Sequence, residues 1–356
     1  MIVDKLLLFP YFLVLVLRNY MYDKGILKSY KSPLPSICVG NVTAGGTGKT
    51  PMVELLIRLY KEEMRIAVVS RGYGRKTKGP RMVSVDDTYR DVGDEPLQIK
   101  RKFPDVMVMV DASRKRAVDA LASLPDGERP DMVIFDDAYQ HRRIRAGFNI
   151  VLVSSSRPVF RDALLPIGRL RDLPSRVAKA DMVVVTKVEE AVDDALRRRW
   201  RHDLRLPSRI PLLMSRIAYL TPEPVFPGEC DGRYKYATGA VLVTGIADNA
   251  TLRREAGWRF SLNEVLSFPD HHGYSSSDFA RIVSALRRYP TSLVLTTEKD
   301  AQRLVSHPDV PVQIKSRLFY LPIVSEIIPD VDVRRYIQEE LPGVGLAQLK
   351  ENITIS

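Results

Sequence analysis

The sequence predicts an α/β protein with a parallel sheet that helices cover on both faces. Short runs that are apolar at nearly every position recur through the first part of the chain, as is typical of strands buried on both faces. Segments with helical apolar spacing, such as residues 49–63, separate these runs. Strands that alternate with helices form parallel sheets. The strand-like runs are residues 36–40, 65–70, 105–110, 131–135, 149–153 and 181–186.

A glycine-rich turn, GNVTAGGTGKTP at residues 40–51, joins the first run to the first helical segment. Glycines here let backbone N–H groups turn inward around phosphate oxygens at the start of a helix. In such a loop, Lys49 reaches the β- and γ-phosphates and the Thr50 hydroxyl binds Mg²⁺. The turn therefore predicts a P-loop NTPase-type sheet and a nucleotide site formed by Thr43, Ala44, Gly45, Gly46, Thr47, Gly48, Lys49 and Thr50.

One residue of this turn departs from the consensus G-x-x-x-x-G-K-[ST]. Thr43 stands where the first glycine is expected. That glycine marks the point where the chain leaves the strand, so a threonine fits there if its φ is negative. A chance glycine-rich turn is the alternative interpretation.

Two acidic residues end the run at 131–135, which continues as DMVIFDD. A P-loop usually has a partner acid at the end of a neighbouring strand, where it helps to hold Mg²⁺. Asp136 is the first candidate for this role and Asp137 the second, although aspartate is also common in turns. The run at 181–186 ends in VTK, whose Lys187 could pack against a nucleotide base or simply end the strand.

The second half of the chain predicts a smaller α/β lobe. Prolines and glycines concentrate at 206–236, which is typical of a linker or a short β excursion. Further strand-like runs follow at 241–245, 292–297 and 318–322. The expected domains are an N-terminal helix at 1–30, a P-loop nucleotide-binding domain at 31–205, a linker at 206–236 and a C-terminal α/β lobe at 237–356.

The net charge of +11 favours an anionic partner, which could be nucleic acid, an acidic membrane surface or a phosphorylated substrate. No aromatic-interleaved RNA motif and no helix-turn-helix spacing is present, so nucleic acid is not the expected partner. Cys38 and Cys230 are the only cysteines and lie far apart in the sequence. We expect both to be free thiols in a reducing compartment.

An apolar run near the N-terminus, LLLFPYFLVLVL, extends from Leu6 to Leu17. It is shorter than the roughly 20 residues that a spanning helix needs, and Pro10 interrupts it. One interpretation is an interfacial anchor whose cationic side is Arg18, Lys24, Lys28 and Lys31. A first helix packed on the core is the other, and the sequence favours neither.

Two short motifs offer groups that could take up or orient a proton. In GDEP at 93–96, Asp94 could be functional or could cap a helix. In FPDHHGY at 268–274, His271 and His272 are adjacent, and neighbouring side chains diverge in every regular element. A metal shared by both histidines is therefore not expected, whereas one of them could act as a base or as the group that orients it.

These motifs occur in an order that resembles the tetraacyldisaccharide 4'-kinases, the lipid A 4'-kinases of Gram-negative bacteria. The resemblance covers residues 36–322 and rests on GNVTAGGTGKTP, SRGYGR, GDEP, DDAYQH, LPIGRLRD, FPDHH and TEKD. It implies a membrane-associated P-loop kinase that uses ATP and Mg²⁺, and it favours the interfacial interpretation of residues 6–17, so that 1–30 is expected to be a membrane-interfacial helix. Such an enzyme phosphorylates the 4'-hydroxyl of a tetraacylated glucosamine disaccharide 1-phosphate at the cytoplasmic face of the bacterial inner membrane.

The resemblance also implies roles for individual residues. Asp94 and His271 match the family's catalytic pair, which takes the proton from the sugar hydroxyl, and lobe closure would bring them together. Glu95 would add to the metal shell of Thr50, Asp136 and Asp137, while Lys49 would assist catalysis. The positions around the phosphates or the substrate are matched by Arg71, Arg114 and His141.

Two segments depart from the family pattern. Ala138 and Tyr139 stand where a glycine and a bulky apolar residue are expected, which puts the shape of that loop in doubt. Asp172 replaces a commoner glutamate and so shortens one carboxylate in an expected substrate loop.

Two other functions would suit a P-loop protein of this composition. A switch or metal-insertion NTPase would hydrolyse nucleotide without an acceptor and would not need the FPDHH segment. A membrane-bound regulatory ATPase would bind anionic vesicles without phosphorylating lipid.

Overall fold

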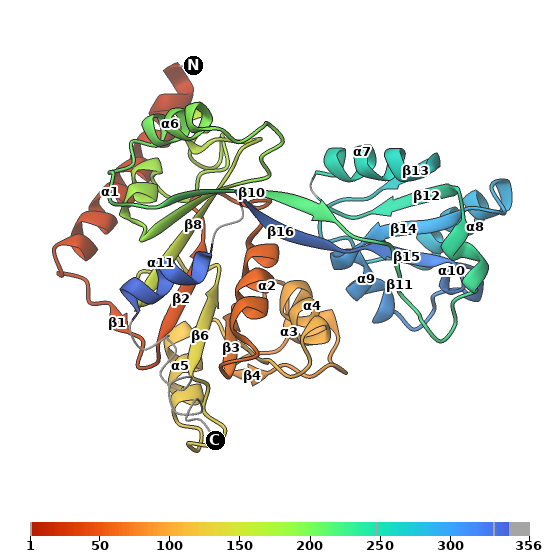
Figure 1. The fold of residues 1–356 in the computed structure, drawn as a ribbon, viewed down its shortest axis with the longest axis horizontal. Helices are drawn as coiled ribbons and strands as arrows, with labels where there is room; N and C mark the ends of the chain where they lie inside the picture. Colours follow the sequence, from red (N-terminus) through yellow and green to blue (C-terminus); the bar gives the residue numbers. More distant parts are fainter. Residues whose placement is uncertain (1, 247, 330–331, 342–356) are drawn as a thin grey trace, which may run out of the picture.

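The computed structural model describes residues 2–246, 248–329 and 332–341. It contains two α/β lobes side by side, each built on its own sheet (Figure 1). Its helices are α1 (Ile2–Asp23), α2 (Lys49–Tyr60), α3 (Tyr89–Val92), α4 (Asp94–Lys102), α5 (Arg114–Ala122), α6 (Asp194–Asp203), α7 (Ala250–Arg259), α8 (Ser276–Arg288), α9 (Glu298–Val305), α10 (Val312–Lys315) and α11 (Val333–Glu340), and short 3-10 helices span Val159–Arg161, Pro174–Lys179 and Gly232–Tyr236.

The first lobe is built on a nine-stranded sheet in the order β16-β10-β9-β8-β2-β6-β3-β5-β4. The strands from β10 to β5 are parallel, as the sequence predicts, and the edge strands β16 and β4 are antiparallel to their neighbours. These strands are β2 (Ser36–Gly40), β3 (Ile66–Ser70), β4 (Arg81–Met82), β5 (Met107–Val110), β6 (Met132–Asp136), β8 (Phe148–Ser154), β9 (Met182–Thr186), β10 (Leu212–Tyr219) and β16 (Ile323–Ile328). A separate parallel pair joins β1 (Tyr30–Lys31) to β7 (Ile144–Arg145).

Hydrophobic cores cover both faces of this sheet. On one face, α1, α5 and α6 contribute side chains such as Leu15, Leu121 and Trp200. On the other face lie α2, α4 and α11, and the completely buried Leu56 and Leu97 are examples. Burial on both sides explains why the central strands are apolar at nearly every position.

The second lobe has a five-stranded sheet in the order β11-β15-β14-β12-β13. Its strands are β11 (Glu223–Pro224), β12 (Gly239–Thr244), β13 (Ser261–Ser267), β14 (Leu293–Thr297) and β15 (Leu318–Leu321). Side chains from α8, α9 and α10 pack on one face, and α7 packs on the other.

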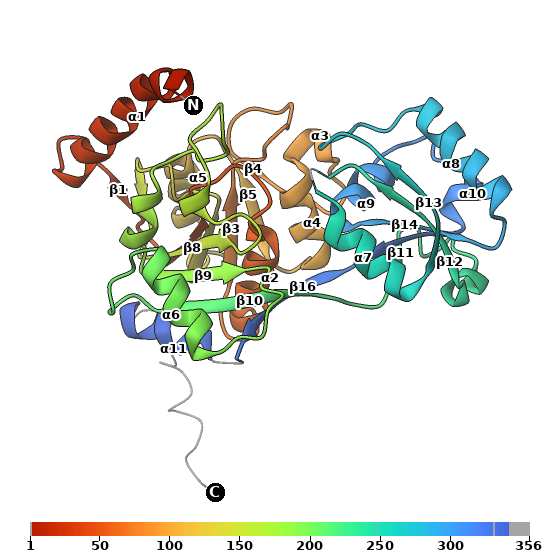
Figure 2. The same ribbon diagram turned by 90° about the horizontal axis from the view of Figure 1, so that it is seen from above.

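Sheet membership divides the chain differently from the domain boundaries expected at 206–236 and 237–356. Within the expected linker, β10 is a strand of the first sheet, and β16 returns from the second lobe to pair with it. The two strands form a ribbon between the lobes (Figures 1 and 2). Helix α11 buries Val333 and Ile337 in the first core. Strand pairing between distant segments leaves no local signal in the sequence, so composition alone misplaces the boundary between the lobes. Residues 342–356 of the expected C-terminal lobe lie outside the described part of the chain.

Helix α1 packs on the first core along one face and leaves apolar side chains exposed along the other. Its inward residue Leu15 is buried in the first core, and Asn19 Nδ2 donates to Asp172 Oδ1 at 2.7 Å. Its outward face leaves Leu13, Val14 and Leu17 about half exposed to solvent, at 47%, 60% and 59%. Among the described residues, no helix is both long and apolar enough to cross a membrane.

Candidate active site

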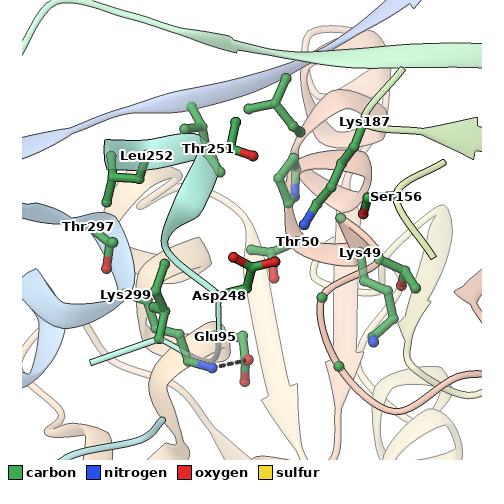
Figure 3. Close-up of a pocket in the computed structure, with 18 of the residues that line it drawn as sticks. Lys49, Thr50, Glu95, Ser156, Lys187, Asp248, Thr251, Leu252, Thr297 and Lys299 are labelled. Carbon is green, nitrogen blue, oxygen red and sulfur yellow. Dashed lines mark ion pairs between the residues drawn. The ribbon is translucent and has the colours of Figure 1, made fainter. Parts of the chain in front are cut away.

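A cavity of about 1510 Å³ lies between the lobes. The first lobe contributes the loops that follow β2, β3, β6 and β9, all at the carboxyl ends of parallel strands. Open α/β sheets bind ligands at this edge. The second lobe contributes residues of α7, of α9 and of the loop after β13, and Figure 3 shows side chains from both lobes pointing into the cavity.

The glycine-rich turn lines this cavity from Ala44 to Thr50. Gly45, Gly46 and Gly48 have φ values of 69°, 66° and 79°, in the left-handed region that glycine enters without strain. Nothing lies within 4 Å of a Cβ built on Gly45 or Gly46, so backbone conformation rather than space calls for glycine there.

Thr43 does not line the cavity, although it was predicted to bind nucleotide. It is buried, it forms an isolated β-bridge with Leu170, and its carbonyl accepts a bond from Arg171 Nε at 3.0 Å. The φ of Thr43 is not positive, which explains why glycine is not needed at this position. Through these contacts with Leu170 and Arg171, Thr43 connects the glycine-rich turn to the segment at 165–172.

Asp136 and Asp137 end β6 beside the turn. Asp137 has a φ of 50°. Its Oδ1 accepts a hydrogen bond from Arg171 Nη2 at 2.9 Å and lies 3.8 Å from Lys49 Nζ. Burial opposes ionisation of Asp137, but Lys49 and Arg171 outweigh it and lower its pKa. Burial raises the pKa of Asp136 to about 6, and the charges of Asp137 and Glu95 add to the shift.

The predicted metal residues fit Mg²⁺ by their donor chemistry. Thr50, Glu95, Asp136 and Asp137 supply hydroxyl and carboxylate oxygens to one region of the cavity. Burial is the main cause of the raised pKa of Asp136, and the charges of Asp137 and Glu95 add to it; a divalent cation would relieve this repulsion. Within the described chain, no three His, Cys, Asp or Glu side chains converge on one metal position. Mg²⁺ needs no such cage, since one or two carboxylates, waters and substrate phosphates commonly hold it.

Asp94 and His271 lie in contact across the two lobes. Asp94 opens α4 directly after Gly93, whose φ is 95°, and its carboxylate is buried. His271 Nδ1 lies 3.0 Å from Asp94 Oδ2. The N-cap of α4 is Gly93, so the side chain of Asp94 does not cap the helix. The two residues come from different lobes, as expected, and in this structure they already touch.

The adjacent histidines diverge, as their positions predict. His271 has a φ of 58° and faces the cavity. His272 turns away, stacks on Phe268 and lies with Nε2 2.9 Å from Asp278 Oδ2. One histidine thus joins the cavity while the other fixes its loop to the start of α8.

Two cations of α9 complete this side of the site, and the sequence analysis assigned a role to neither. Lys299 Nζ lies 2.9 Å from Glu95 Oε1 (Figure 3). It also lies 3.3 Å from His271 Nε2. Arg303 Nε donates to Asp94 Oδ2 at 3.1 Å. Lys299 lies within TEKD, which is the signal that could have drawn attention to it. Arg303 lies just beyond that motif, one helical turn from Asp300.

The three residues matched to phosphate or substrate positions, Arg71, Arg114 and His141, all line the cavity. Arg114 is buried, and its Nε and Nη1 have no hydrogen-bond partner among the described residues. Burial lowers the pKa of Arg114, although the negative charges of Asp136 and Asp137 act to raise it. Burial and the charge of Arg114 lower the pKa of His141 to about 4, so this imidazole is neutral near pH 7.

The two departures from the family pattern have structural explanations. Tyr139 packs against the end of β2, where a Cβ on Gly40 would lie 2.4 Å from its Cβ, and its hydroxyl donates to the Arg176 carbonyl at 2.6 Å. Asp172 is completely buried and accepts bonds from Asn19 of α1 and from the Leu173 amide. The short carboxylate of Asp172 therefore anchors α1 and does not face the cavity, contrary to the expected substrate loop.

Comparison with known proteins gives consistent matches. The family model described as tetraacyldisaccharide-1-P 4'-kinase matches residues 5–341. The tetraacyldisaccharide 4'-kinase of Parabacteroides distasonis is 42% identical over 312 residues, which is 86% of this chain and 85% of the relative. That of Flavobacterium johnsoniae is 37% identical over 352 residues, covering 94% and 98%. The crystal structure of LpxK from Aquifex aeolicus in complex with ATP matches with a TM-score of 0.74 and 28% identity, over 96% of this chain and all of that one.

Proposed function

The chain belongs to the tetraacyldisaccharide-1-P 4'-kinase family, and from this premise we propose how its cavity carries out the phosphoryl transfer. The protein is a lipid A 4'-kinase that uses ATP, in line with the names of its relatives and the ATP complex of its structural neighbour. Its acceptor is the 4'-hydroxyl of a tetraacylated glucosamine disaccharide 1-phosphate.

The first lobe holds the triphosphate. Backbone N–H groups of Gly45, Gly46 and Gly48 surround the phosphates at the start of α2, where the helix dipole favours negative charge. Lys49 leaves Asp137 to neutralise charge on the β- and γ-phosphates. When bound at Thr50, Asp136 and Asp137, with Glu95 nearby, Mg²⁺ would neutralise the charge that develops on the transferred phosphoryl group.

Asp94 and His271 act together as the general base. The pair takes the proton of the 4'-hydroxyl while that oxygen forms its bond to the γ-phosphorus, and ADP leaves with the electrons of the broken P–O bond. A carboxylate alone is a poor base near pH 7, and a neighbouring imidazole can share or relay the proton. The contact of 3.0 Å between residues from different lobes, at the cavity that contains the P-loop, is the observation that carries the proposal.

Arg71, Arg114 and His141 bind phosphate oxygens of ATP or of the acceptor. Nε and Nη1 of Arg114 support this role, because buried N–H groups without an acceptor are costly unless an anion supplies one. The neutral His141 can donate a hydrogen bond without adding charge.

The enzyme acts at the cytoplasmic face of the inner membrane, where an acylated acceptor resides, and the outward face of α1 supports this part of the proposal. Leu13, Val14 and Leu17 form an exposed apolar stripe, and interfacial helices bury such a face at the headgroup boundary. Replacing all three with serine is expected to weaken binding to phosphatidylglycerol vesicles at least tenfold in a flotation assay, while transfer to acceptor in detergent micelles persists. Equal vesicle binding by the triple variant and the wild-type chain would contradict this part.

Labelled phosphate transfer from ATP to the tetraacylated acceptor in mixed micelles tests the proposed function. Asp94→Asn and His271→Ala are expected to slow transfer about 10²-fold or more, in the range for loss of a general base. Wild-type rates in both variants would agree with kinase activity but would contradict the proposal that Asp94 and His271 form the general base. Hydrolysis of nucleotide without acceptor, and no transfer, would instead favour a switch NTPase.

A further inference from the structure

Every described hydrogen bond to the carboxylate of Asp94 is made to one of its oxygens. Oδ2 lies 3.0 Å from His271 Nδ1, accepts Arg303 Nε at 3.1 Å, and also accepts Arg303 Nη2. The rigid guanidinium fork thus closes on a single oxygen. A carboxylate held at one oxygen by two fixed donors has a defined plane, and the imidazole beside it inherits that orientation.

Arg303 is itself held from the second lobe. Its side chain is 1% exposed, and Nη1 donates to the Gly245 carbonyl at 3.2 Å and to Asp300 Oδ1 at 3.1 Å. Asp300 is completely buried and accepts bonds from the Gly245 amide at 2.9 Å and from Thr297 Oγ1 at 2.8 Å. The guanidinium therefore cannot move without breaking its contacts to Gly245, which follows β12, and to Asp300 of α9.

The acid–base–acid series Asp300–Arg303–Asp94 crosses from the second lobe to the first. Asp94 belongs to α4, which packs on the first core, whereas Asp300 and Arg303 belong to α9. The orientation of the first-lobe carboxylate is consequently fixed by a cation that the second lobe delivers.

A simpler role for Arg303 would be to fasten the lobes together. Other residues along the same two helices already do so: Lys102 Nζ lies 2.6 Å from Glu298 Oε1, and Arg101 Nη1 donates to Gln302 Oε1 at 2.9 Å. Neither contact touches Asp94. Because α4 and α9 are joined without Arg303, its two bonds to the carboxylate call for a different explanation.

We propose that Arg303, held by Asp300, is a positioning residue that orients Asp94 and, through it, His271 for proton removal from the acceptor hydroxyl. The inference rests on the proposed function of the Asp94–His271 pair. It assigns a role to the end of the TEKD segment, and it requires no contact between Arg303 and either substrate.

The test compares Arg303→Gln with Gln302→Ala, the adjacent α9 residue that bonds to α4 away from Asp94. For each variant, kcat and the KM values for ATP and acceptor are measured in mixed micelles, together with the thermal unfolding midpoint. Arg303→Gln is expected to lower kcat about 10²-fold, as misplacement of a reacting group by about 1 Å does, with both KM values within about threefold of wild type. Gln302→Ala is expected to keep its kcat. A folded Arg303→Gln variant with the kcat of the control would overturn the inference.

Double variants show whether Arg303 acts through Asp94. If it does, adding Arg303→Gln to Asp94→Asn produces no further loss of kcat, because residues that act as a unit are not additive. A double variant slowed by the product of the two single effects would place Arg303 in a separate function. If Asp94→Asn and His271→Ala are slow but Arg303→Gln is as fast as wild type, only the positioning role of Arg303 is contradicted. If Asp94→Asn and His271→Ala themselves have wild-type rates, the proposal that Asp94 and His271 form the general base is contradicted.

Removal of a buried arginine leaves two carboxylates uncompensated, so Arg303→Gln could fail to fold. Arg303→Lys keeps the charge and loses the fork, and we expect it to fold with kcat lowered about tenfold or more. Added guanidinium ion is expected to raise the kcat of Arg303→Ala and to leave that of Gln302→Ala unchanged. An Arg303→Lys variant with wild-type kcat would overturn the inference.

Discussion

The two sides of the cavity are built in opposite ways. The P-loop side consists of consecutive residues, and the groups that we propose to bind phosphate are backbone N–H groups of glycines with positive φ. The other side consists of single side chains from α4, from α9 and from the loop that contains His271. One side is thus a local conformation, whereas the other exists only when the lobes touch. Phosphate binding can survive changes that abolish proton removal, and each side can be tested by itself.

The largest effect is expected on the P-loop side. Lys49→Ala should lower kcat about 10³-fold, because it removes a fixed cation from the place where negative charge develops. Lys61→Ala is the matched control, since its side chain is 39% exposed at the far end of α2 and pairs with Glu62. Rates of transfer at saturating ATP check the prediction, and a Lys49 variant no slower than the Lys61 control would contradict it.

The next effect separates the adjacent histidines on the other side. His271→Ala should lower kcat about 10²-fold, while His272→Ala should leave kcat within about threefold of wild type. His272 contacts Asp278 and Phe268, so its loss should instead lower the unfolding midpoint. Equal losses of kcat in both variants would show that the loop matters only as a whole.

Gly93 combines features of both sides of the cavity. Its backbone conformation sets the direction of the side chain of Asp94, which contacts the second lobe. At its φ of 95°, an added Cβ would lie 3.0 Å from the Tyr73 carbonyl oxygen and 3.1 Å from Gly72. Gly93→Ala should cost about 1–3 kcal/mol of unfolding free energy and should lower kcat with little change in ATP binding. Chemical denaturation and nucleotide titration measure the two effects, and a fully stable, fully active variant would refute this account of the turn.

The smallest effect concerns pH and the contact between α4 and α9. Burial and the nearby charge of Glu54 raise the pKa of Glu298 to about 6 from 4.5. The folded state therefore keeps this proton at pH values where the unfolded state has lost it, and stability should fall as pH rises from about 4.5 to 6. The expected fall is on the order of 1–2 kcal/mol.

Glu298→Gln isolates this contribution. Glutamine cannot titrate, and Lys102 keeps its partner Glu54 at 2.7 Å. The variant should gain stability relative to wild type across the same pH window, as measured by denaturant unfolding. A stability difference that does not change between pH 4.5 and 6 would rule out Glu298 as the titrating group.

Prediction from the sequence succeeded where the signal was local. Runs that are apolar at nearly every position predicted the parallel strands, because strands buried on both faces do not alternate apolar and polar residues. The spacing of Gly45, Gly46, Gly48, Lys49 and Thr50 predicted a P-loop, because that signal lies within a few consecutive residues, and the three glycines do have positive φ. Asp94 and His271 came only from the resemblance to a family, since 177 positions separate them. Neither capping statistics nor metal-ligand spacing connects the two.

The sequence by itself therefore determined the fold class, the glycine-rich turn between β2 and α2 and the pair of acids at the end of β6. The tertiary structure alone decided that β16 and α11 return to the first lobe, that Thr43 supports the loop from outside the cavity and that Asp172 anchors α1. It also decided that Lys299 and Arg303 meet the Asp94–His271 pair. The physical reason is common to all of these: backbone preference and periodicity act over a few residues, whereas a contact between lobes depends on how every intervening element packs.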